Sequence, residues 1–164
     1  MKRSFFGVFL CLGSSGLFSL SFEKPPVQRL LKVGVGVYDI IHDPHHPLLQ
    51  VEYRSCLPCF PYARPLFGIM GTERATLYVY GGMALDLFLG KGFVLTPSFA
   101  PGLYVQGKGK DLGFPLEFRS SMELSYILPN RGRIGAQFYH ISNASLGSKN
   151  PGAEALVFFY GIPL

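Results

Sequence analysis

The sequence predicts an all-β protein, an eight-stranded antiparallel transmembrane β-barrel of the outer-membrane type. Hydrophobic residues make up 48% of the 164 residues, yet no uninterrupted apolar run is long enough for a membrane-spanning helix. From residue 30 onward, apolar and polar residues alternate in segments of about ten residues, separated by turn-forming residues. An even number of such strands can close into a barrel that satisfies every backbone hydrogen bond within a bilayer.

The first 21 residues are expected to form a secretory signal peptide. Two basic residues follow the initial methionine, a short apolar core covers residues 5–12, and residues 19–21 form a suitable small-residue cleavage site. A buried N-terminal strand is the alternative interpretation. If the peptide is removed, residues 22–164 form a single barrel domain, since their number suits one domain and no more.

The first two predicted strands flank a loop that is rich in histidine and proline. The alternating apolar residues are Leu31, Val33, Val35 and Val37 in the first strand, and Leu49, Val51 and Tyr53 in the second. Between the strands, residues 42–47 combine three histidines with an aspartate, which suggests a metal site. Two prolines in the same stretch favour a rigid, irregular loop instead, so we predict no metal here.

The next three strands are expected at roughly residues 65–71, 76–89 and 93–105. Cys56 and Cys59 precede them as a C-x-x-C sequence. No strand–helix unit surrounds these cysteines, so a redox motif is not predicted. A tight disulfide or two free thiols in a turn remain as alternatives, and an exported protein meets an oxidising compartment that favours the disulfide.

The sixth strand, over residues 116–126, separates two kinds of side chain most clearly. Apolar residues occupy one face, and the other face carries Glu117, Arg119, Ser121, Glu123 and Ser125. In a closed barrel such charges can pair with each other in the lumen, whereas a soluble sandwich would hide the apolar face. The alternation alone does not decide which face is inside.

The last two predicted strands bring three polar residues together. The seventh strand ends at Ser142, and the eighth covers residues 153–164. His140 and Ser142 are two residues apart, so on a strand they share one face. If the strands pair antiparallel about residue 147, Glu154 lies opposite His140. A serine nucleophile needs a neighbouring base, and that base needs a third group to orient it. The hairpin therefore predicts a Ser–His–Glu triad.

The wider string around this hairpin resembles the signature of the lipid A 3-O-deacylases, the PagL family. That signature is close to H-x-S-N-A-G, a short loop, N-x-G and a glutamate fourteen residues after the histidine. The matching residues are His140, Ser142, Asn143, Ala144, Asn150, Pro151, Gly152 and Glu154. One departure is visible, because Ser145 stands where the family usually has glycine.

The resemblance implies an outer-membrane esterase that removes the ester-linked acyl chain at position 3 of lipid A in lipopolysaccharide. It implies Ser142 as the nucleophile, His140 as the general base and Glu154 as the group that orients the histidine. In outer-membrane barrels both termini are periplasmic, so the seventh strand carries His140 and Ser142 to the outer rim. Both are in phase with the apolar Phe138, so we expect the triad to face lipid.

The resemblance also implies the remaining parts of the site. Asn150 and the backbone N–H of Ser145 are the expected oxyanion-hole donors, and Asn143 is expected to shape the site. No metal or cofactor is implied. The expected partner is lipid A in the outer leaflet of the bacterial outer membrane, in which the barrel is embedded, and related deacylases suggest a homodimer.

Two other function classes remain as alternatives. The first is a non-enzymatic eight-stranded barrel with a structural or adhesive role. The second is a soluble lipid carrier of the lipocalin type, but the usual Gly-x-Trp start is absent because the chain has no tryptophan. The net charge of +5 is dispersed, so no nucleic-acid partner is predicted. The segment 107–111 lacks the spacing and following helix of a phosphate-cradling nucleotide loop.

Overall fold

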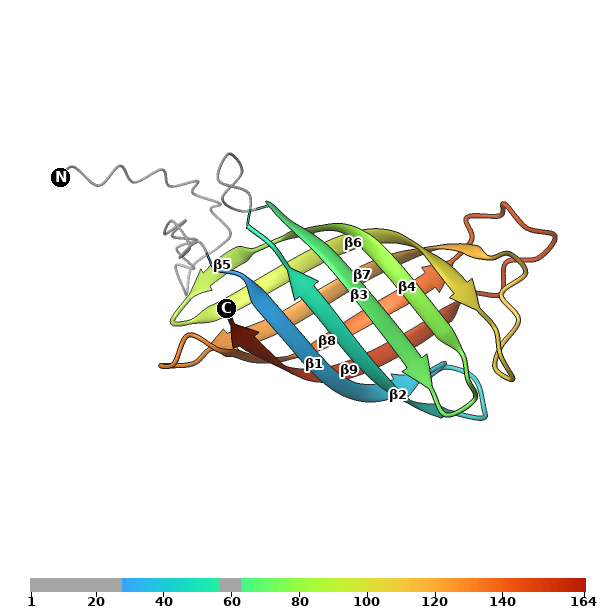
Figure 1. Ribbon diagram of the computed structural model, residues 1–164, viewed down its shortest axis with the longest axis horizontal. Helices are drawn as coiled ribbons and strands as arrows, with labels where there is room; N and C mark the ends of the chain where they lie inside the picture. Colours follow the sequence, from blue (N-terminus) through green and yellow to red (C-terminus); the bar gives the residue numbers. More distant parts are fainter. Residues whose placement is uncertain (1–27, 57–62) are drawn as a thin grey trace, which may run out of the picture.

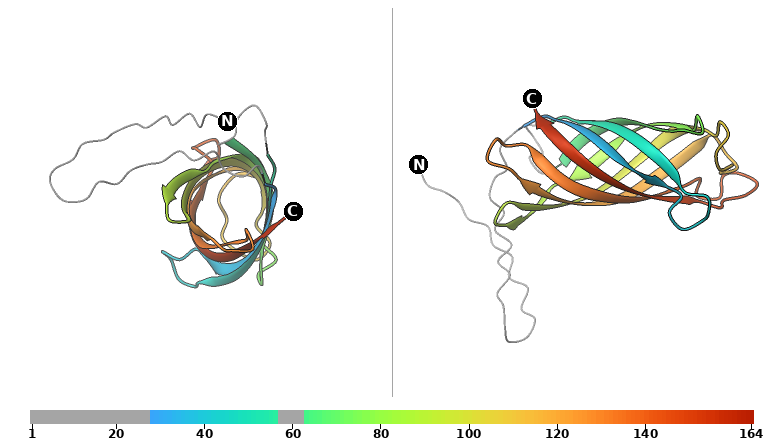
Figure 2. Two further views of the ribbon diagram at one scale, coloured as in Figure 1. Left: turned by 90° about the vertical axis from the view of Figure 1, so that its left-hand side faces the viewer. Right: turned by 90° about the horizontal axis from the view of Figure 1, so that it is seen from below.

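The computed structural model describes residues 28–56 and 63–164 of the chain. Residues 1–21 and Cys59 lie outside this part, so the signal peptide and the alternatives for the cysteine pair stay predictions. The described strands wind around one axis, and the view along that axis in Figure 2 shows them as a ring. Within these residues no helical segment has the length and hydropathy needed to cross a bilayer.

Nine strands build the ring, and Figure 1 labels them in chain order. They are β1 (Leu30–Tyr38), β2 (His46–Arg54), β3 (Ala63–Thr72), β4 (Leu77–Leu85), β5 (Leu87–Gly90), β6 (Phe93–Val105), β7 (Leu116–Ile127), β8 (Arg133–Ser142) and β9 (Ala153–Pro163). β4 and β5 both pair with β6 and are separated only by Asp86. They therefore form one interrupted strand, and the nine elements make an eight-stranded barrel.

One pairing between strands far apart in the sequence closes the barrel. β1 pairs antiparallel with β9, whereas β4, like β5, pairs antiparallel with β6, the strand that follows them in the chain. The remaining neighbours are consecutive hairpins, as in an up-and-down barrel. Closure lets the backbone groups of the described strands bond within the sheet, which a hydrocarbon environment requires. The predicted eight-stranded antiparallel barrel is thus confirmed.

The predicted fourth strand, residues 76–89, is continuous in the sequence pattern but interrupted in the structure. Asp86 is fully buried and accepts hydrogen bonds from Thr96 and Arg133, at 2.9 and 2.8 Å. The pairing with β6 then shifts between Phe88 and Gly90. A side chain held inward by two luminal partners, followed by a register shift, explains why the strand divides at this point.

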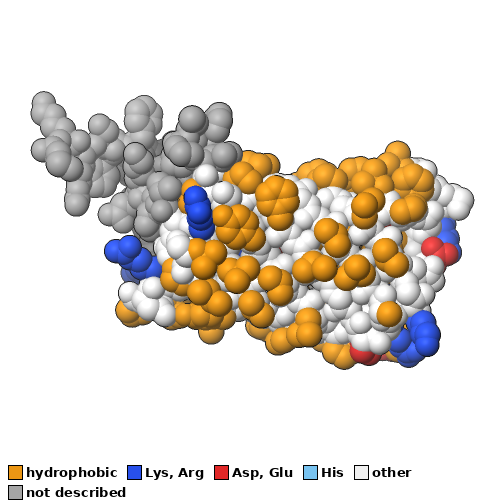
Figure 3. All heavy atoms as spheres, viewed as in Figure 1, with side chains coloured by type: hydrophobic (Ala, Val, Ile, Leu, Met, Phe, Trp, Pro, Cys, Tyr) orange, Lys and Arg blue, Asp and Glu red, His pale blue; other side chains and the backbone are white. Residues whose placement is uncertain are grey.

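The outer surface of the barrel is apolar and the lumen is polar. Figure 3 shows hydrophobic side chains over the middle of the visible face and charged side chains at the two ends. The exposed apolar set includes Val35, Leu49, Phe67, Val79, Phe99, Met122, Leu124, Phe138 and Phe158. The polar face of β7 points inward instead, with Glu117, Arg119 and Glu123 fully buried. This inversion matches an outer-membrane barrel and excludes the lipocalin-type alternative for this chain.

An ion-pair network fills the middle of the lumen. The Lys32 ammonium lies 3.1 Å from Glu52 and 2.5 Å from Glu123, and the Arg54 guanidinium lies 2.8 and 2.6 Å from the same two carboxylates. All four side chains are almost completely buried. Because each charge has partners of the opposite sign, removing one residue would leave another charge buried and uncompensated, at a cost of about 3–5 kcal/mol.

The lipid-facing belt gives a direct test of the inside-out arrangement. Phe158 lies near the middle of β9 and is 59% exposed on the outer face. We expect Phe158→Lys to impair insertion, because a lysine on this face costs about 2–4 kcal/mol at the bilayer midplane. Phe158→Leu, which keeps the site apolar, is the control. Heat-modifiable migration after refolding into lipid vesicles measures the folded fraction, and equal folding of both variants would contradict a lipid-facing Phe158.

The two ends of the barrel differ in the length of their connections. Residues 39–45, 106–115 and 143–152 connect strands at one end, opposite the C-terminus in Figure 1. The short turns at residues 91–92 and 128–132 lie at the other end. Outer-membrane barrels have short periplasmic turns and longer external loops. The end that carries residues 143–152 is therefore the outer end.

Candidate active site

The hairpin of β8 and β9 brings a histidine and a glutamate together at this outer end. In the β8–β9 pairing, His140 lies directly opposite Glu154, as the spacing predicts. His140 Nδ1 lies 2.8 Å from Glu154 Oε1. A carboxylate in this position accepts a hydrogen bond from Nδ1–H and so fixes the tautomer in which Nε2 is the free base. The pair therefore has the geometry of an oriented general base.

The pair faces outward from the barrel. The side chain of His140 is 43% exposed and that of Glu154 is 16% exposed. Tyr139 and Ile141, which flank His140 on β8, are buried in the lumen. Phe138, two residues before His140, is exposed on the lipid-facing surface. A substrate can thus reach the imidazole from the bilayer side, as the phase of the strand predicts.

Ser142 is the last residue of β8 and lies on the same face as His140. Within the described residues, its hydroxyl makes no hydrogen bond to the imidazole. Bonds between a nucleophile and its base are often long in hydrolases without substrate and shorten when substrate binds. The structure therefore brings His140 and Glu154 into direct contact and leaves Ser142 beside them, at the mouth of the loop that follows.

The loop of residues 143–152 is held by one buried asparagine. The Asn143 side chain is fully buried, and its Nδ2 donates to the backbone oxygens of Leu112 and Lys149, at 2.7 and 2.8 Å. Leu112 belongs to the β6–β7 loop, so one side chain ties the loop after Ser142 to its neighbour. These contacts fix the start of the loop, and the site-shaping role expected for Asn143 stays a prediction.

A salt bridge strengthens the same junction at the surface. Lys149 Nζ lies 2.7 Å from Asp111 Oδ2, and the Gly113 amide donates to the Asp111 carboxylate at 2.9 Å. The contact with Lys149 has the larger effect and the Gly113 amide the smaller, and both hold the pKa of the Asp111 carboxyl below its ordinary value. The carboxylate is therefore ionised at neutral pH and can hold the two loops together.

The two expected oxyanion donors lie on this loop. Asn150 Oδ1 accepts a hydrogen bond from the Asn143 backbone N–H at 3.0 Å, so the amide orientation is fixed and its NH₂ group points away from that contact. Ser145 has a φ of +64°, a left-handed conformation that glycine adopts most easily. This conformation gives a physical reason for the glycine usual at this position, and Ser145 retains the backbone N–H that the role requires.

Gly152 has a role that the sequence alone did not reveal. Its φ is +64°, and a Cβ at this position would lie 2.6 Å from His140 Cε1 and 3.3 Å from His140 Nε2. The bare glycine backbone thus packs against the edge of the imidazole that carries the free nitrogen. Only a residue without a side chain leaves the ring in its place beside Glu154.

We expect Gly152→Ala to lower catalytic activity without unfolding the barrel. The methyl group would displace the imidazole, and a displacement of about 1 Å in a catalytic group can cost on the order of 10²-fold in rate. The left-handed backbone adds about 1–2 kcal/mol of strain. Gly161→Ala on β9 is the matched control, because a Cβ there meets its nearest atom only at 3.5 Å. Equal turnover of an ester substrate by the two variants would contradict this role.

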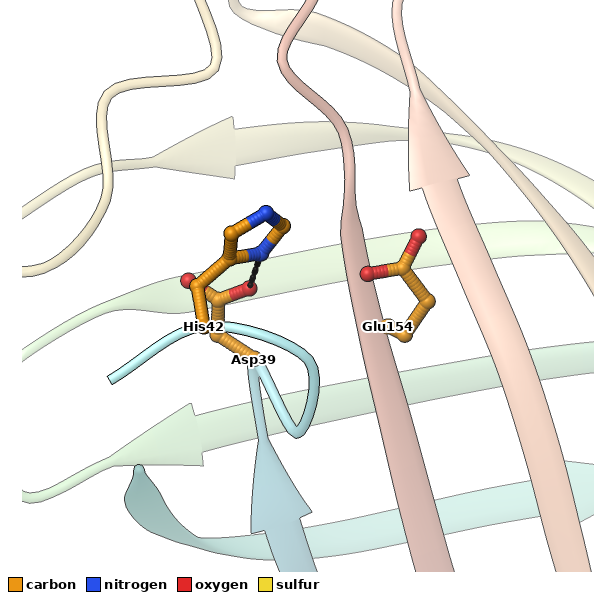
Figure 4. Close-up of side chains that lie close together, drawn as sticks. All are labelled: Asp39, His42 and Glu154. Atoms are coloured by element: carbon orange, nitrogen blue, oxygen red, sulfur yellow. Dashed lines mark hydrogen bonds and ion pairs between the residues drawn. The ribbon is translucent and has the colours of Figure 1, made fainter. Parts of the chain in front are cut away.

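A second cluster lies next to Glu154. Figure 4 shows Asp39 and His42, from the loop after β1, beside Glu154 of β9. One possible ligand atom from each lies within 4.8 Å of the others, a spacing compatible with a metal ion. However, Lys110 Nζ already lies 2.9 Å from Asp39 Oδ1 and 3.2 Å from His42 Nδ1. An ion would have to displace this ammonium, so the cluster is better described as an ion pair that borders the site.

The histidines of the stretch at residues 42–47 each contact a different carboxylate. His42 Nδ1 lies 3.1 Å from Asp39 Oδ1. His46 Nδ1 contacts Glu73 at 2.8 Å, and His45 Nε2 contacts Asp43 at 3.3 Å. The histidines thus have separate carboxylate partners and do not converge on one point. Asp39 was not a predicted site residue, since nothing in the sequence pattern links it to a glutamate near the other end of the chain.

Comparison with known families identifies the family of this chain. The family model described as Lipid A 3-O-deacylase (PagL) matches residues 61–163, which is more than half of the chain. The chain belongs to the lipid A 3-O-deacylase (PagL) family. The match contains β8, β9 and the loop between them. This barrel is therefore a bacterial outer-membrane protein of the PagL family.

Two solved structures resemble the barrel in fold. The crystal structure of the outer membrane enzyme PagL aligns with a TM-score of 0.65 at 15% identity, over 82% of this chain and 99% of that one. A de novo designed transmembrane β-barrel aligns with a TM-score of 0.61 at 9% identity, over 87% of this chain and 100% of that one. No curated protein sequence matches this PagL-family chain significantly.

Proposed function

We propose that this PagL-family barrel is a serine esterase that hydrolyses the acyl ester at position 3 of lipid A in the outer leaflet. The observation that carries the proposal is the 2.8 Å contact between His140 Nδ1 and Glu154 on the lipid-facing side of the outer rim. A base in this position serves an ester that approaches from within the membrane. Family membership supports the choice of lipid A as the substrate.

The first half of the reaction transfers the acyl group to the enzyme. Ser142 Oγ attacks the carbonyl carbon while His140 Nε2 takes the hydroxyl proton, and Glu154 stabilises the resulting imidazolium. The carbonyl oxygen becomes an oxyanion, and the Asn150 NH₂ group and the Ser145 N–H donate hydrogen bonds to it in this proposal. The carbon–oxygen bond to the sugar then breaks, and the leaving oxygen takes the proton from His140.

The second half releases the fatty acid. A water molecule gives a proton to His140 Nε2 and attacks the acyl carbon of the ester on Ser142. A second oxyanion forms in the same place and collapses, and Ser142 Oγ leaves with the proton from the imidazolium. The products are a free fatty acid and lipid A with a free hydroxyl group at position 3, and the triad returns to its starting state.

The position of the site suits an embedded substrate. The acyl chains of lipid A lie parallel to the outer face of the barrel, where Phe138 is exposed. A charged group costs about 2–4 kcal/mol at the midplane of the bilayer but only about 0–1 kcal/mol near its surface. Glu154 is tolerable at the rim for this reason, and also because it is bonded to His140.

Mass spectrometry of lipid A tests this function. The chain is produced in the outer membrane of a bacterium that lacks such an enzyme, and lipid A is extracted and compared with that of the parent strain. We expect the loss of one ester-linked acyl chain, assigned to position 3 by fragmentation. Unchanged lipid A in cells that contain the folded barrel would favour the non-enzymatic structural or adhesive alternative.

A further inference from the structure

A polar pocket opens at the outer rim next to the catalytic pair. Its volume is about 510 Å³, and four outer connections contribute to it. The lining residues are Asp39, His42, Asp43, Pro44, His46, Arg74, Lys108, Gly109, Lys110 and Pro151. Pro151 belongs to the loop that carries Asn150 and Gly152, and Asp39 and His42 border Glu154. The pocket is therefore continuous with the outer side of the active site.

The carboxylates in this pocket leave two of its cations without a close partner. Lys110 is paired with Asp39 at 2.9 Å. The nearest carboxylate to Arg74 is Glu73, whose Oε1 lies 4.0 Å from Arg74 Nε and is already bonded by His46 at 2.8 Å. Within the described residues, Lys108 forms no ion pair. In the part of the chain that the structure describes, Arg74 and Lys108 therefore lack a close carboxylate partner, and they outnumber Asp43, the remaining lining carboxylate, which contacts His45 at 3.3 Å.

A backbone hydrogen bond joins the two residues that carry these cations. The Lys108 N–H donates to the Arg74 carbonyl oxygen at 2.8 Å, which links the β6–β7 loop to the β3–β4 turn. Next to this link, Thr76 Oγ1 donates to the Gln106 carbonyl oxygen at 2.9 Å. Both side chains line the same pocket, so both can donate charge-assisted hydrogen bonds to an anion bound there. The arrangement does not depend on the glycine-rich spacing of a nucleotide loop.

We infer that this pocket binds a phosphate monoester on the sugar headgroup of the lipid substrate, with Arg74 and Lys108 as its principal contacts. The inference rests on the proposed function, since lipid A is a phosphorylated, acylated glucosamine disaccharide. A headgroup phosphate held beside Pro151 restricts how the sugar lies over His140 and so selects which ester meets Ser142. Arg74 and Lys108 are accordingly specificity-determining residues, distinct from the triad.

The test measures binding separately from hydrolysis. The full barrel with Ser142→Ala is solubilised in detergent and titrated calorimetrically with lipid A and with dephosphorylated lipid A. We expect the phosphorylated lipid to bind at least about tenfold more tightly, the effect of one charge-assisted hydrogen bond. Adding Arg74→Ala and Lys108→Ala should abolish this difference, and raising the salt concentration should reduce it.

Controls separate the possible outcomes. Lys91→Ala removes an exposed lysine at the periplasmic end and should keep the full difference between the two lipids. Heat-modifiable migration verifies that each variant is folded. Equal binding of both lipids by the parent barrel, or an undiminished difference in the double variant, would overturn the inference. Titration with inorganic phosphate is the last arm, and binding of phosphate without any preference between the lipids would assign the pocket to the free ion and also overturn it.

This readout remains valid if the proposed function fails. Wild-type protein that leaves lipid A intact would refute the esterase, whereas the calorimetric difference is measured in a variant that needs no catalysis. Conversely, an active enzyme that binds both lipids equally would leave the esterase standing and remove the phosphate subsite.

Discussion

Replacement of Ser142 by alanine is expected to lower the rate of lipid A deacylation by at least about 10³-fold while the barrel stays folded. The change removes one oxygen from a rim position and leaves the lumen untouched. Without the hydroxyl no acyl–enzyme can form, and only slow attack by water remains. The measurement is turnover of purified, refolded enzyme on lipid A in mixed micelles.

Ser120 provides the matched control for this variant. It lies directly opposite His140 in the β7–β8 pairing and is exposed on the same outer face. It is therefore another serine within cross-strand distance of the imidazole. We expect Ser120→Ala to retain most of the activity. An inactive Ser120→Ala variant together with an active Ser142→Ala variant would make Ser120 the nucleophile. That result would refute the assignment of Ser142.

Loss of the base should be more damaging than loss of the residue that orients it. We expect His140→Ala to reduce turnover about as much as Ser142→Ala, because no other group is in place to take the hydroxyl proton. Turnover by Glu154→Ala should be about 10–100-fold faster than turnover by His140→Ala, because the histidine keeps Nε2 and loses only the group that fixes its tautomer. Steady-state rates of the two variants on the same substrate give the comparison. A Glu154→Ala enzyme as fast as wild type would show that another group orients His140.

Alternation of side chains made most of this barrel predictable. Glu117 and Arg119 alternate with Leu116 and Phe118, and the structure places the first pair in the lumen and the second on the outside. The pattern itself fits a soluble sandwich equally well with its faces exchanged. The choice depends on closure through the β1–β9 pairing, which joins distant parts of the chain. The division of the fourth strand at Asp86 likewise depends on distant luminal partners.

Only the part of the active site that lies within one hairpin was predictable from the sequence. The register of one hairpin puts His140 opposite Glu154, so spacing along the chain was sufficient. Asp39 reaches Glu154 from the loop after β1, and no periodicity relates these two residues. The role of Gly152 depends on a left-handed backbone against an imidazole edge, a contact visible only in three dimensions. The same is true of Lys108 and Arg74, which one backbone hydrogen bond between two loops holds together.

The central claim is that Ser142 is the nucleophile, activated by His140, and covalent labelling tests it most directly. Folded barrel is incubated with a long-chain alkyl phosphonate that reacts with activated serines, and the product is examined by intact mass and peptide mapping. We expect one adduct, located on Ser142, that forms in wild type and Ser120→Ala but not in His140→Ala. A folded barrel that remains unlabelled, or an adduct on any other residue, would contradict the account.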